Sequence, residues 1–356
     1  MFGLDPDQLA TELAAHRRRL AAGVDALAAT AGLRTGATPK DAVYREDKLV
    51  LYRYRAQVAQ PVAVPVLIVY ALVNRPYVVD LQDDRSTVRG LLEQGLDVYL
   101  IDWGYPDSTD RYLELDDYID HYLHRCVTHI CNAHQLAAIN LLGICQGGTF
   151  SVCYAALHPE RVRNLVTMVT PIDFRTPGDR LAQWAQALDA DLAVNTLGNI
   201  PGAWLSAALM TLSPYRQWGQ KYVRAVDRFD DASALRHFLR MERWIFDSPD
   251  QAGAAYRQFV TWLYQENRLV RGRLRLGGKP VRLSELTMPI FNLYATADHL
   301  VPPPASIALG RYAGSTDYRE FAFPAGHVGM YVSARAQAII PPAIAAWVTA
   351  RSAPGQ

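Results

Sequence analysis

Residues 138–157 read AINLLGICQGGTFSVCYAAL, and this stretch decides the fold. A short apolar run at 138–142 has the length and composition of a buried strand. Residues 149–157 follow with a helical pattern. Between the two lies the segment 143–148, GICQGG, in which glycines flank the single cysteine Cys145. The order predicts a strand, a tight turn that carries a nucleophile, and a helix.

This order is that of the nucleophile elbow of the α/β-hydrolase fold, written there as G-x-S-x-G, with cysteine here in place of serine. The turn forces the nucleophile into a strained backbone conformation. Gly143 and Gly147 lack the side chains that would collide where strand and helix approach closely. The N-terminus of the helix favours a thiolate and can direct a backbone N–H at an oxyanion. Cys145 is therefore the predicted nucleophile, and the alternative is a structural buried cysteine.

Two further residues complete a catalytic set in the order that this fold uses, an acid and then a histidine after the nucleophile. Asp298 follows the apolar run 290–294 in the segment YATADH, and His327 follows the run 318–323 in the segment FPAGHVG. Both lie in loops after predicted strands, at the edge of the sheet where α/β active sites gather. We predict His327 as the base and Asp298 as its orienting acid, because His299 follows the wrong strand for the base.

The oxyanion donors are predicted from the same fold. Its second donor comes from the loop after an early strand. Here that loop is residues 70–76, YALVNRP. We expect the backbone N–H of Val73 to be one donor, and the backbone N–H of Gln146, directly after the nucleophile, to be the other.

The rest of the chain alternates short apolar runs with helical patterns, which is typical of a mostly parallel sheet in an α/β fold. Between residue 171 and about residue 285 this alternation stops, and the sequence becomes rich in Trp and Arg and mostly helical. A segment of roughly 115 residues is too long for a simple connection. The sequence therefore predicts an α/β-hydrolase fold with a mostly parallel sheet and an inserted, mainly helical cap.

The expected organisation follows from these patterns. An N-terminal helical segment takes residues 1–36, the core takes 37–170 and 286–356, and the cap takes 171–285. Leucines at helical spacing in residues 5–32 indicate a helix that packs on its own domain or docks on a partner. Strands are expected at residues 49–55, 64–70, 96–101, 138–142, 165–169, 290–294 and 318–323, and the clearest helix at 112–132.

Composition excludes several classes of protein. The chain has 356 residues, half of them hydrophobic, with 36 basic against 35 acidic side chains. Balanced charge argues against a nucleic-acid binder, because such proteins need clustered, unbalanced Lys and Arg. No apolar run approaches the roughly 18 residues of a membrane-spanning helix, and the first residues do not form a secretory signal. We expect no nucleic acid, no transmembrane segment and a cytoplasmic protein.

The number and spacing of the cysteines and histidines indicate whether disulfides or a metal site are expected. Four cysteines within one short stretch of a long chain are no disulfide framework, which fits a reducing compartment. Histidines and cysteines gather between residues 112 and 134, but their spacing is poor for a metal site, so neither a metal nor another cofactor is predicted. The residues concerned are His121, His124, Cys126, His129, Cys131 and His134.

Together these residues resemble the catalytic subunit of bacterial polyhydroxyalkanoate synthases, particularly the short two-subunit class, class III. The segment 143–148 resembles the family's lipase-box-like motif, with cysteine in place of serine and paired glycines. The length of the chain fits the short class. The resemblance covers about residues 40 to 335, and its other motifs are LVNRPY at 72–77, DWG at 102–104, PIDF at 171–174, GNIPG at 198–202, ADHLVPP at 297–303 and GHVG at 326–329.

The resemblance implies an acyltransferase that polymerises (R)-3-hydroxyacyl-CoA, with 3-hydroxybutyryl-CoA as the expected substrate. Cys145, deprotonated by His327, would attack the thioester, release CoA and hold the acyl group. Growth then needs the 3-hydroxyl of one unit to attack the thioester of another, and in this family Asp298 is thought to help activate that hydroxyl. The resemblance also implies a second synthase subunit, a homo-oligomer and a place at the surface of polyester granules.

The same residues allow two other functions. A cysteine-nucleophile hydrolase, or another acyltransferase of the same fold, would carry the same three residues. A non-enzymatic binding protein that keeps the fold would leave the intact set of three unexplained.

Overall fold

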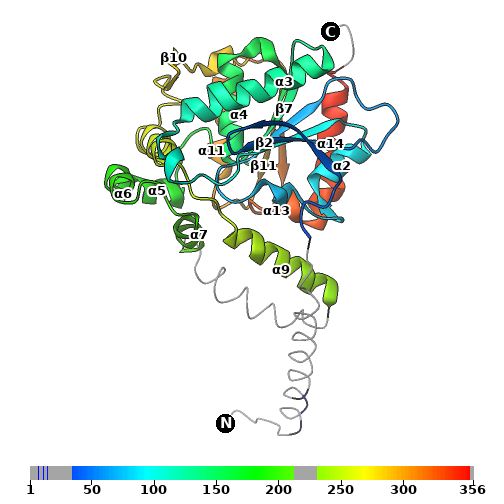
Figure 1. Cartoon of the computed structure of the whole chain (residues 1–356), viewed down its shortest axis with the longest axis horizontal. Helices are drawn as coiled ribbons and strands as arrows, with labels where there is room; N and C mark the ends of the chain where they lie inside the picture. The colour runs from blue at the N-terminus through cyan, green and yellow to red at the C-terminus, as the bar shows by residue number, and fades with distance from the viewer. Residues whose placement is uncertain (1–6, 8–10, 12–13, 15–33, 212–230, 353–356) are drawn as a thin grey trace.

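An eight-stranded sheet forms the centre of the part of the chain that the structure describes, residues 34–211 and 231–352 with residues 7, 11 and 14 of this computed structural model (Figure 1). The strand order is β1-β2-β6-β3-β7-β8-β11-β12. Strand β2 runs antiparallel to β1 and β6, and the other neighbours are parallel. The bounds are β1 Lys40–Glu46, β2 Leu49–Tyr54, β3 Val66–Val69, β6 Val98–Asp102, β7 Ile139–Ile144, β8 Val162–Met168, β11 Ile290–Ala295 and β12 Tyr318–Phe323.

Helices cover both faces of this sheet, which explains why its central strands are continuous apolar runs. Helices α3 (His124–His134) and α4 (Gln146–Leu157) pack on one face, with Ile130 and Phe150 in its core. Helices α2 (Thr87–Glu93), α13 (Gly329–Val332) and α14 (Ala334–Thr349) pack on the other face, with Leu91 and Ile340 in its core (Figure 1). The predicted α/β-hydrolase fold is confirmed.

The structure corrects two local predictions. Strand β1 was not expected, because its sequence KDAVYRE is an edge strand with charged side chains and no alternating apolar pattern. The helix expected at 112–132 begins only at residue 115, because residues Ser108–Tyr112 form a separate 3-10 helix that Asp107 caps. It then passes through a π-helix, η3 (Asp117–Leu123), before α3. The other expected strands lie within a few residues of the observed ones, as is usual for element ends.

The described chain between β8 and β11 adds no strand to the eight-stranded sheet. It is mainly helical, and a short β-bridge joins Ile200 to Gln251. Its described elements are α5 (Arg180–Ala187), α6 (Ala190–Leu197), α7 (Gly202–Thr211), α9 (Ala232–Phe246), α10 (Gly253–Gln258), the π-helix η6 (Phe259–Gln265), the strands β9 (Arg275–Leu276) and β10 (Lys279–Pro280) and the 3-10 helix η7 (Leu283–Glu285). We call this segment the cap; the domain boundaries drawn from the sequence stay a prediction.

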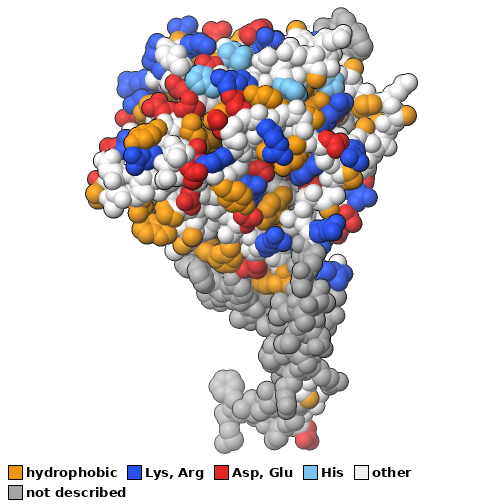
Figure 2. Space-filling model, in the orientation of Figure 1, with side chains coloured by type: hydrophobic (Ala, Val, Ile, Leu, Met, Phe, Trp, Pro, Cys, Tyr) orange, Lys and Arg blue, Asp and Glu red, His pale blue; other side chains and the backbone are white. Residues whose placement is uncertain are grey.

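Large apolar side chains are exposed on the cap. Leu192 is 64% exposed and Trp204 is 61% exposed, and Trp184 is also exposed. Figure 2 shows apolar side chains gathered over the helices α5 to α7 of Figure 1. None of the described helices is long and apolar enough to cross a membrane. Except for residues 7, 11 and 14, the helix expected at residues 5–32 lies outside the described residues.

Candidate active site

Cys145 occupies the sharp turn between β7 and α4. Its backbone has φ of 56° and ψ of −127°, a positive φ that a residue with a side chain rarely adopts. The Cys145 N–H donates to the Met168 carbonyl at the end of β8, at 3.0 Å, which holds the turn in this strained form. The structure therefore presents Cys145 at the carboxyl edge of the sheet, directly before the first turn of α4.

Neighbouring glycines allow this turn to pack. A Cβ at Gly147 would fall against the Val69 carbonyl oxygen and 2.6 Å from the Tyr70 carbonyl carbon. A Cβ at Gly143 would lie 2.5 Å from the Cα of Gly148. Both obstacles are backbone atoms that cannot turn aside, so strand and helix approach this closely only over glycine.

His327 and Asp298 meet across two loops of the sheet edge. Asp298 follows β11 and His327 follows β12, and these strands are parallel neighbours. The His327 Nδ1 lies 2.7 Å from the Asp298 Oδ2. The other carboxylate oxygen of Asp298 accepts the N–H groups of Leu300 and Val301, each at 2.9 Å. With Asp298 fixed in this way, Nδ1 of His327 carries the proton and Nε2 is left for the thiol.

Cys145 and His327 line the same cavity, and His327 contacts Asp298 behind it, which brings the three predicted residues together. Burial alone lowers the pKa of His327, but the charge of Asp298, with smaller contributions from its hydrogen bond and from Cys145, outweighs burial and holds the pKa of His327 above its ordinary value. This direction favours the protonated, imidazolium form of His327.

The loop after β3 lies against the elbow. The Leu72 N–H donates to the Gln146 Oε1 at 2.9 Å, which ties the loop to the start of α4. Val73, Gln146, Cys145 and His327 line one cavity. Both predicted oxyanion donors thus lie in the wall of the cavity that Cys145 also lines.

The cap also holds this loop in place. The Asn74 Nδ2 donates to the carbonyls of Trp244 and Ile245, each at 3.2 Å, at the end of α9. In return, the Trp244 Nε1 donates to the Arg75 carbonyl at 2.8 Å. A movement of α9 would therefore displace Asn74 and, with it, the neighbouring residue Val73.

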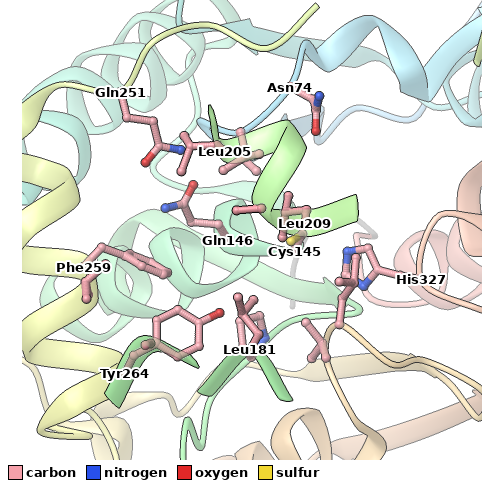
Figure 3. A pocket seen from close by; sticks show the side chains of 18 of the residues that line it. Asn74, Cys145, Gln146, Leu181, Leu205, Leu209, Gln251, Phe259, Tyr264 and His327 are labelled. Atoms are coloured by element: carbon pink, nitrogen blue, oxygen red, sulfur yellow. The ribbon is translucent and has the colours of Figure 1, made fainter. Parts of the chain in front are cut away.

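The cavity in front of Cys145 has a volume of about 440 Å³ and is largely apolar (Figure 3). The sequence did not single out its cap residues, because spacing alone does not show which face of a short helix meets the core. Asp298 does not line the cavity; its side chain is fully buried behind His327. The cap residues that line it include Leu181, Trp184, Leu205, Leu209, Phe259 and Tyr264.

Three tyrosines that the sequence did not single out lie around the predicted catalytic residues. Tyr70 and Tyr331 place their hydroxyl oxygens 3.4 Å apart, and the ring of Tyr331 lies edge-on to His327. Tyr264 lines the wall of the cavity opposite His327 (Figure 3). Burial, with the charge of Cys145 added, raises the pKa of all three. Their hydroxyls therefore stay protonated and act as hydrogen-bond donors rather than bases.

The histidines and cysteines between residues 112 and 134 serve separate local contacts. His134 Nε2 lies 2.8 Å from the Tyr99 hydroxyl, and His124 Nδ1 lies 3.2 Å from the Tyr154 hydroxyl. His129 packs against the ring of Tyr44. Cys126 and Cys131 are buried in the core under α3.

Fold and site together define a protein of the α/β-hydrolase fold with a cysteine at the nucleophile elbow. A family model described as alpha/beta hydrolase fold matches residues 64–334. Among solved structures, a putative non-heme bromoperoxidase from Mycobacterium tuberculosis is 14% identical with a TM-score of 0.55, covering 88% of this chain and 100% of its own. A monoglyceride lipase from Saccharomyces cerevisiae is 10% identical with a TM-score of 0.56, covering 90% of this chain and 97% of its own. At such identities these structures show the fold alone.

Comparison of sequences gives the family. A model described as Poly-beta-hydroxybutyrate polymerase (PhaC) N-terminus matches residues 3–91. The poly(3-hydroxyalkanoate) polymerase subunit PhaC of Allochromatium vinosum is 55% identical over 99% of this chain and 100% of its own length. That of a Synechocystis strain is 54% identical over 90% of this chain and 86% of its own. The chain belongs to the poly(3-hydroxyalkanoate) polymerases, as a PhaC subunit, and is an enzyme of polyhydroxyalkanoate biosynthesis.

Proposed function

We propose that Cys145 carries the growing polyester as a thioester and that (R)-3-hydroxyacyl-CoA, with 3-hydroxybutyryl-CoA first, is the substrate. The observation that carries this proposal is that Cys145 and His327 line one apolar cavity, with His327 hydrogen-bonded to the buried Asp298 behind it. His327 takes the thiol proton, and the thiolate attacks the thioester carbonyl. The new Cys145 thioester forms, and CoA leaves as a thiol with the proton that His327 returns.

Chain growth uses the same groups a second time. The 3-hydroxyl of a second hydroxyacyl-CoA attacks the Cys145 thioester carbonyl, and His327 accepts the hydroxyl proton. An ester bond forms, the C–S bond to Cys145 breaks, and the Cys145 sulfur leaves and takes the proton from His327. The lengthened chain is then a CoA thioester, which Cys145 attacks again with release of CoA. Asp298 acts through His327, because its carboxylate is fully buried behind the imidazole and does not line the cavity. The family resemblance implies that Asp298 helps to activate the hydroxyl. In this proposal Asp298 does so indirectly, because its charge raises the basicity of His327.

The oxyanion of each tetrahedral intermediate would lie between the backbone N–H groups of Val73 and Gln146. Support comes from the positions of both residues in the wall of the cavity that Cys145 lines. The hydrogen bond from the Leu72 N–H to the Gln146 side chain also fixes the loop that carries Val73 to the start of α4. Donors fixed before the reaction stabilise the developing charge without reorganising during it. Because Asn74 joins this loop to α9, the cap would contribute to the precision of the oxyanion site.

The apolar cap gives the physical reason for transfer rather than hydrolysis. Side chains such as Leu181, Leu205 and Phe259 enclose the space in front of Cys145 and disfavour water there. A cysteine-nucleophile hydrolase or another acyltransferase would carry the same three residues and is the competing function.

The family resemblance also supplies the setting that we propose: a cytoplasmic enzyme at the surface of polyester granules, a homo-oligomer that works with a second synthase subunit. Trp204 and Leu192 support the granule contact, because they expose apolar surface on the cap and a polyester surface is apolar.

The test follows two products from the purified protein and (R)-3-hydroxybutyryl-CoA. Free CoA and insoluble polyester should rise together, and Cys145→Ala should give neither. Cys153→Ala is the matched control, because Cys153 is a buried core cysteine in α4, the helix that follows Cys145, and does not line the cavity. Release of CoA with only monomeric hydroxy acid would show a hydrolase and contradict the proposal.

A further inference from the structure

Gln251 places an unpaired amide in the wall of the active-site cavity. The residue is 4% exposed, and its side chain lines the cavity. Among the described residues, its Nε2 has no hydrogen-bond partner. Figure 3 shows the carboxamide turned toward Leu205 and the interior, on the opposite side of Cys145 from His327.

The backbone around Gln251 is fixed, so the amide is held there by the fold. Gln251 and Ile200 exchange two backbone hydrogen bonds, each of 2.9 Å. The neighbouring Asp250 accepts the Gly202 N–H at 2.9 Å, which closes the same junction between two parts of the cap. These bonds satisfy the backbone of Gln251 and leave only its side chain without a partner.

A buried amide donor without a partner is costly, on the order of 1–3 kcal/mol, and such groups are rare in native proteins. An apolar side chain of the same size would fill this wall at no such cost. The amide is therefore best explained by a ligand that supplies an acceptor when the cavity is filled.

We propose that the Gln251 Nε2 donates a hydrogen bond to an ester carbonyl of the growing polyester, in the unit next to the one held on Cys145. This inference rests on the proposed function. A polyester is the ligand that fits the wall, because it presents apolar carbon with one carbonyl acceptor in every unit. The carbonyl of the unit on Cys145 would accept hydrogen bonds from the backbone N–H groups of Val73 and Gln146. Gln251 lies farther along the cap side of the cavity (Figure 3).

The hydrogen bond would select an acyl-enzyme that already carries a chain. A first hydroxyacyl unit on Cys145 has no ester carbonyl to offer Gln251, whereas every longer chain has one. Gln251 would thus favour elongation over initiation and would hold the chain in one register while the next hydroxyl attacks.

The experiment compares Gln251→Met with the parent protein. Methionine has nearly the length of glutamine but no N–H donor. Rapid-quench measurement of the first CoA released from (R)-3-hydroxybutyryl-CoA should be unchanged. The rate of elongation, followed after loading the enzyme with a hydroxybutyrate trimer thioester of CoA, should fall about 5- to 30-fold, the effect of losing one buried hydrogen bond.

Gln258→Met is the matched control. Gln258 is also buried in the cap, but its Oε1 accepts the Leu115 N–H at 2.8 Å and it does not line the cavity. Its replacement should lower the melting temperature and slow neither step selectively. Gln251→Met should leave the melting temperature of the free protein unchanged or raise it, because the amide that it removes has no partner.

Three results would overturn the inference. Equal slowing of first CoA release and elongation would assign Gln251 to a pantetheine amide carbonyl of CoA instead. An unchanged elongation rate would remove Gln251 from polymer binding, and a lowered melting temperature with both rates reduced would make it structural. Failure of the proposed function is a separate outcome, because then the parent protein itself would form no polymer.

Discussion

The Asp298→Asn exchange tests how the site fixes the proton on His327. One carboxylate oxygen accepts two backbone N–H groups at 2.9 Å, so the carbonyl oxygen of asparagine must take that position. The NH₂ group of asparagine then faces the His327 Nδ1, which lies 2.7 Å from the second oxygen. Nδ1 must accept this hydrogen bond, which moves the ring proton to Nε2 and leaves no acceptor for the Cys145 thiol.

The expected cost follows from this wrong tautomer. The equivalent exchange in a serine protease lowers the rate about 10⁴-fold, so we expect CoA release to fall about 10³- to 10⁴-fold, or about 4 to 5.5 kcal/mol in activation free energy. The assay is the initial rate of CoA release from (R)-3-hydroxybutyryl-CoA at saturating substrate. A variant that keeps more than a tenth of the parent rate would refute the reasoning about the tautomer.

Asp80→Asn is the control for loss of a buried carboxylate. Asp80 accepts the Thr38 and Ser86 hydroxyls at 2.6 and 2.7 Å and does not line the cavity. Its exchange should lower the melting temperature and leave the rate of CoA release unchanged. Equal loss of rate in both variants would mean that Asp298→Asn acts by loosening the fold.

Further predictions concern packing, pH and the partner subunit. Gly147→Ala should reduce the free energy of unfolding by about 1–3 kcal/mol or more and abolish activity, because its Cβ meets the Val69 carbonyl oxygen. Gly178→Ala is the control, because its Cβ meets nothing within 4 Å and only its positive φ is strained. Urea titration should show a loss of about 1 kcal/mol for this control. The raised pKa of His327 adds stability that is present in full below about pH 6.5 and is lost as pH rises through the folded-state pKa, so His327→Gln should flatten the fall in unfolding free energy above pH 6.5. Adding the second synthase subunit should raise the rate of polymer formation, and a chain that is already fully active alone would contradict that partnership.

The elbow and its partners could be predicted because their signals are local. A strand, a flanked cysteine and a helix follow one another without interruption at residues 138–157, and the fold fixes the order in which Asp298 and His327 must follow. The structure hydrogen-bonds His327 to Asp298 and places His327 and Cys145 in the wall of one cavity. Which of them acts on substrate stays a prediction until it is measured.

The cap side of the site could not be predicted, because its residues meet only through tertiary packing. Leu181, Leu205 and Phe259 come from three separate helices, and nothing in their spacing shows which faces converge on Cys145. Gln251 is held by a bridge to Ile200, a contact across 51 residues of sequence that no periodic pattern reveals. Strand β1 was missed for a different reason, because an edge strand with charged side chains lacks the apolar alternation of a half-buried one.

The central claim is that Cys145 holds the acyl chain. The most direct measurement is the mass of the peptide that contains Cys145, taken after the protein has been mixed with (R)-3-hydroxybutyryl-CoA and quenched in acid. The account predicts that this peptide gains the mass of one or more hydroxybutyryl units in the parent protein and in Cys153→Ala, and none in Cys145→Ala. Acyl groups on another peptide, or covalent labelling that persists in Cys145→Ala, would contradict it.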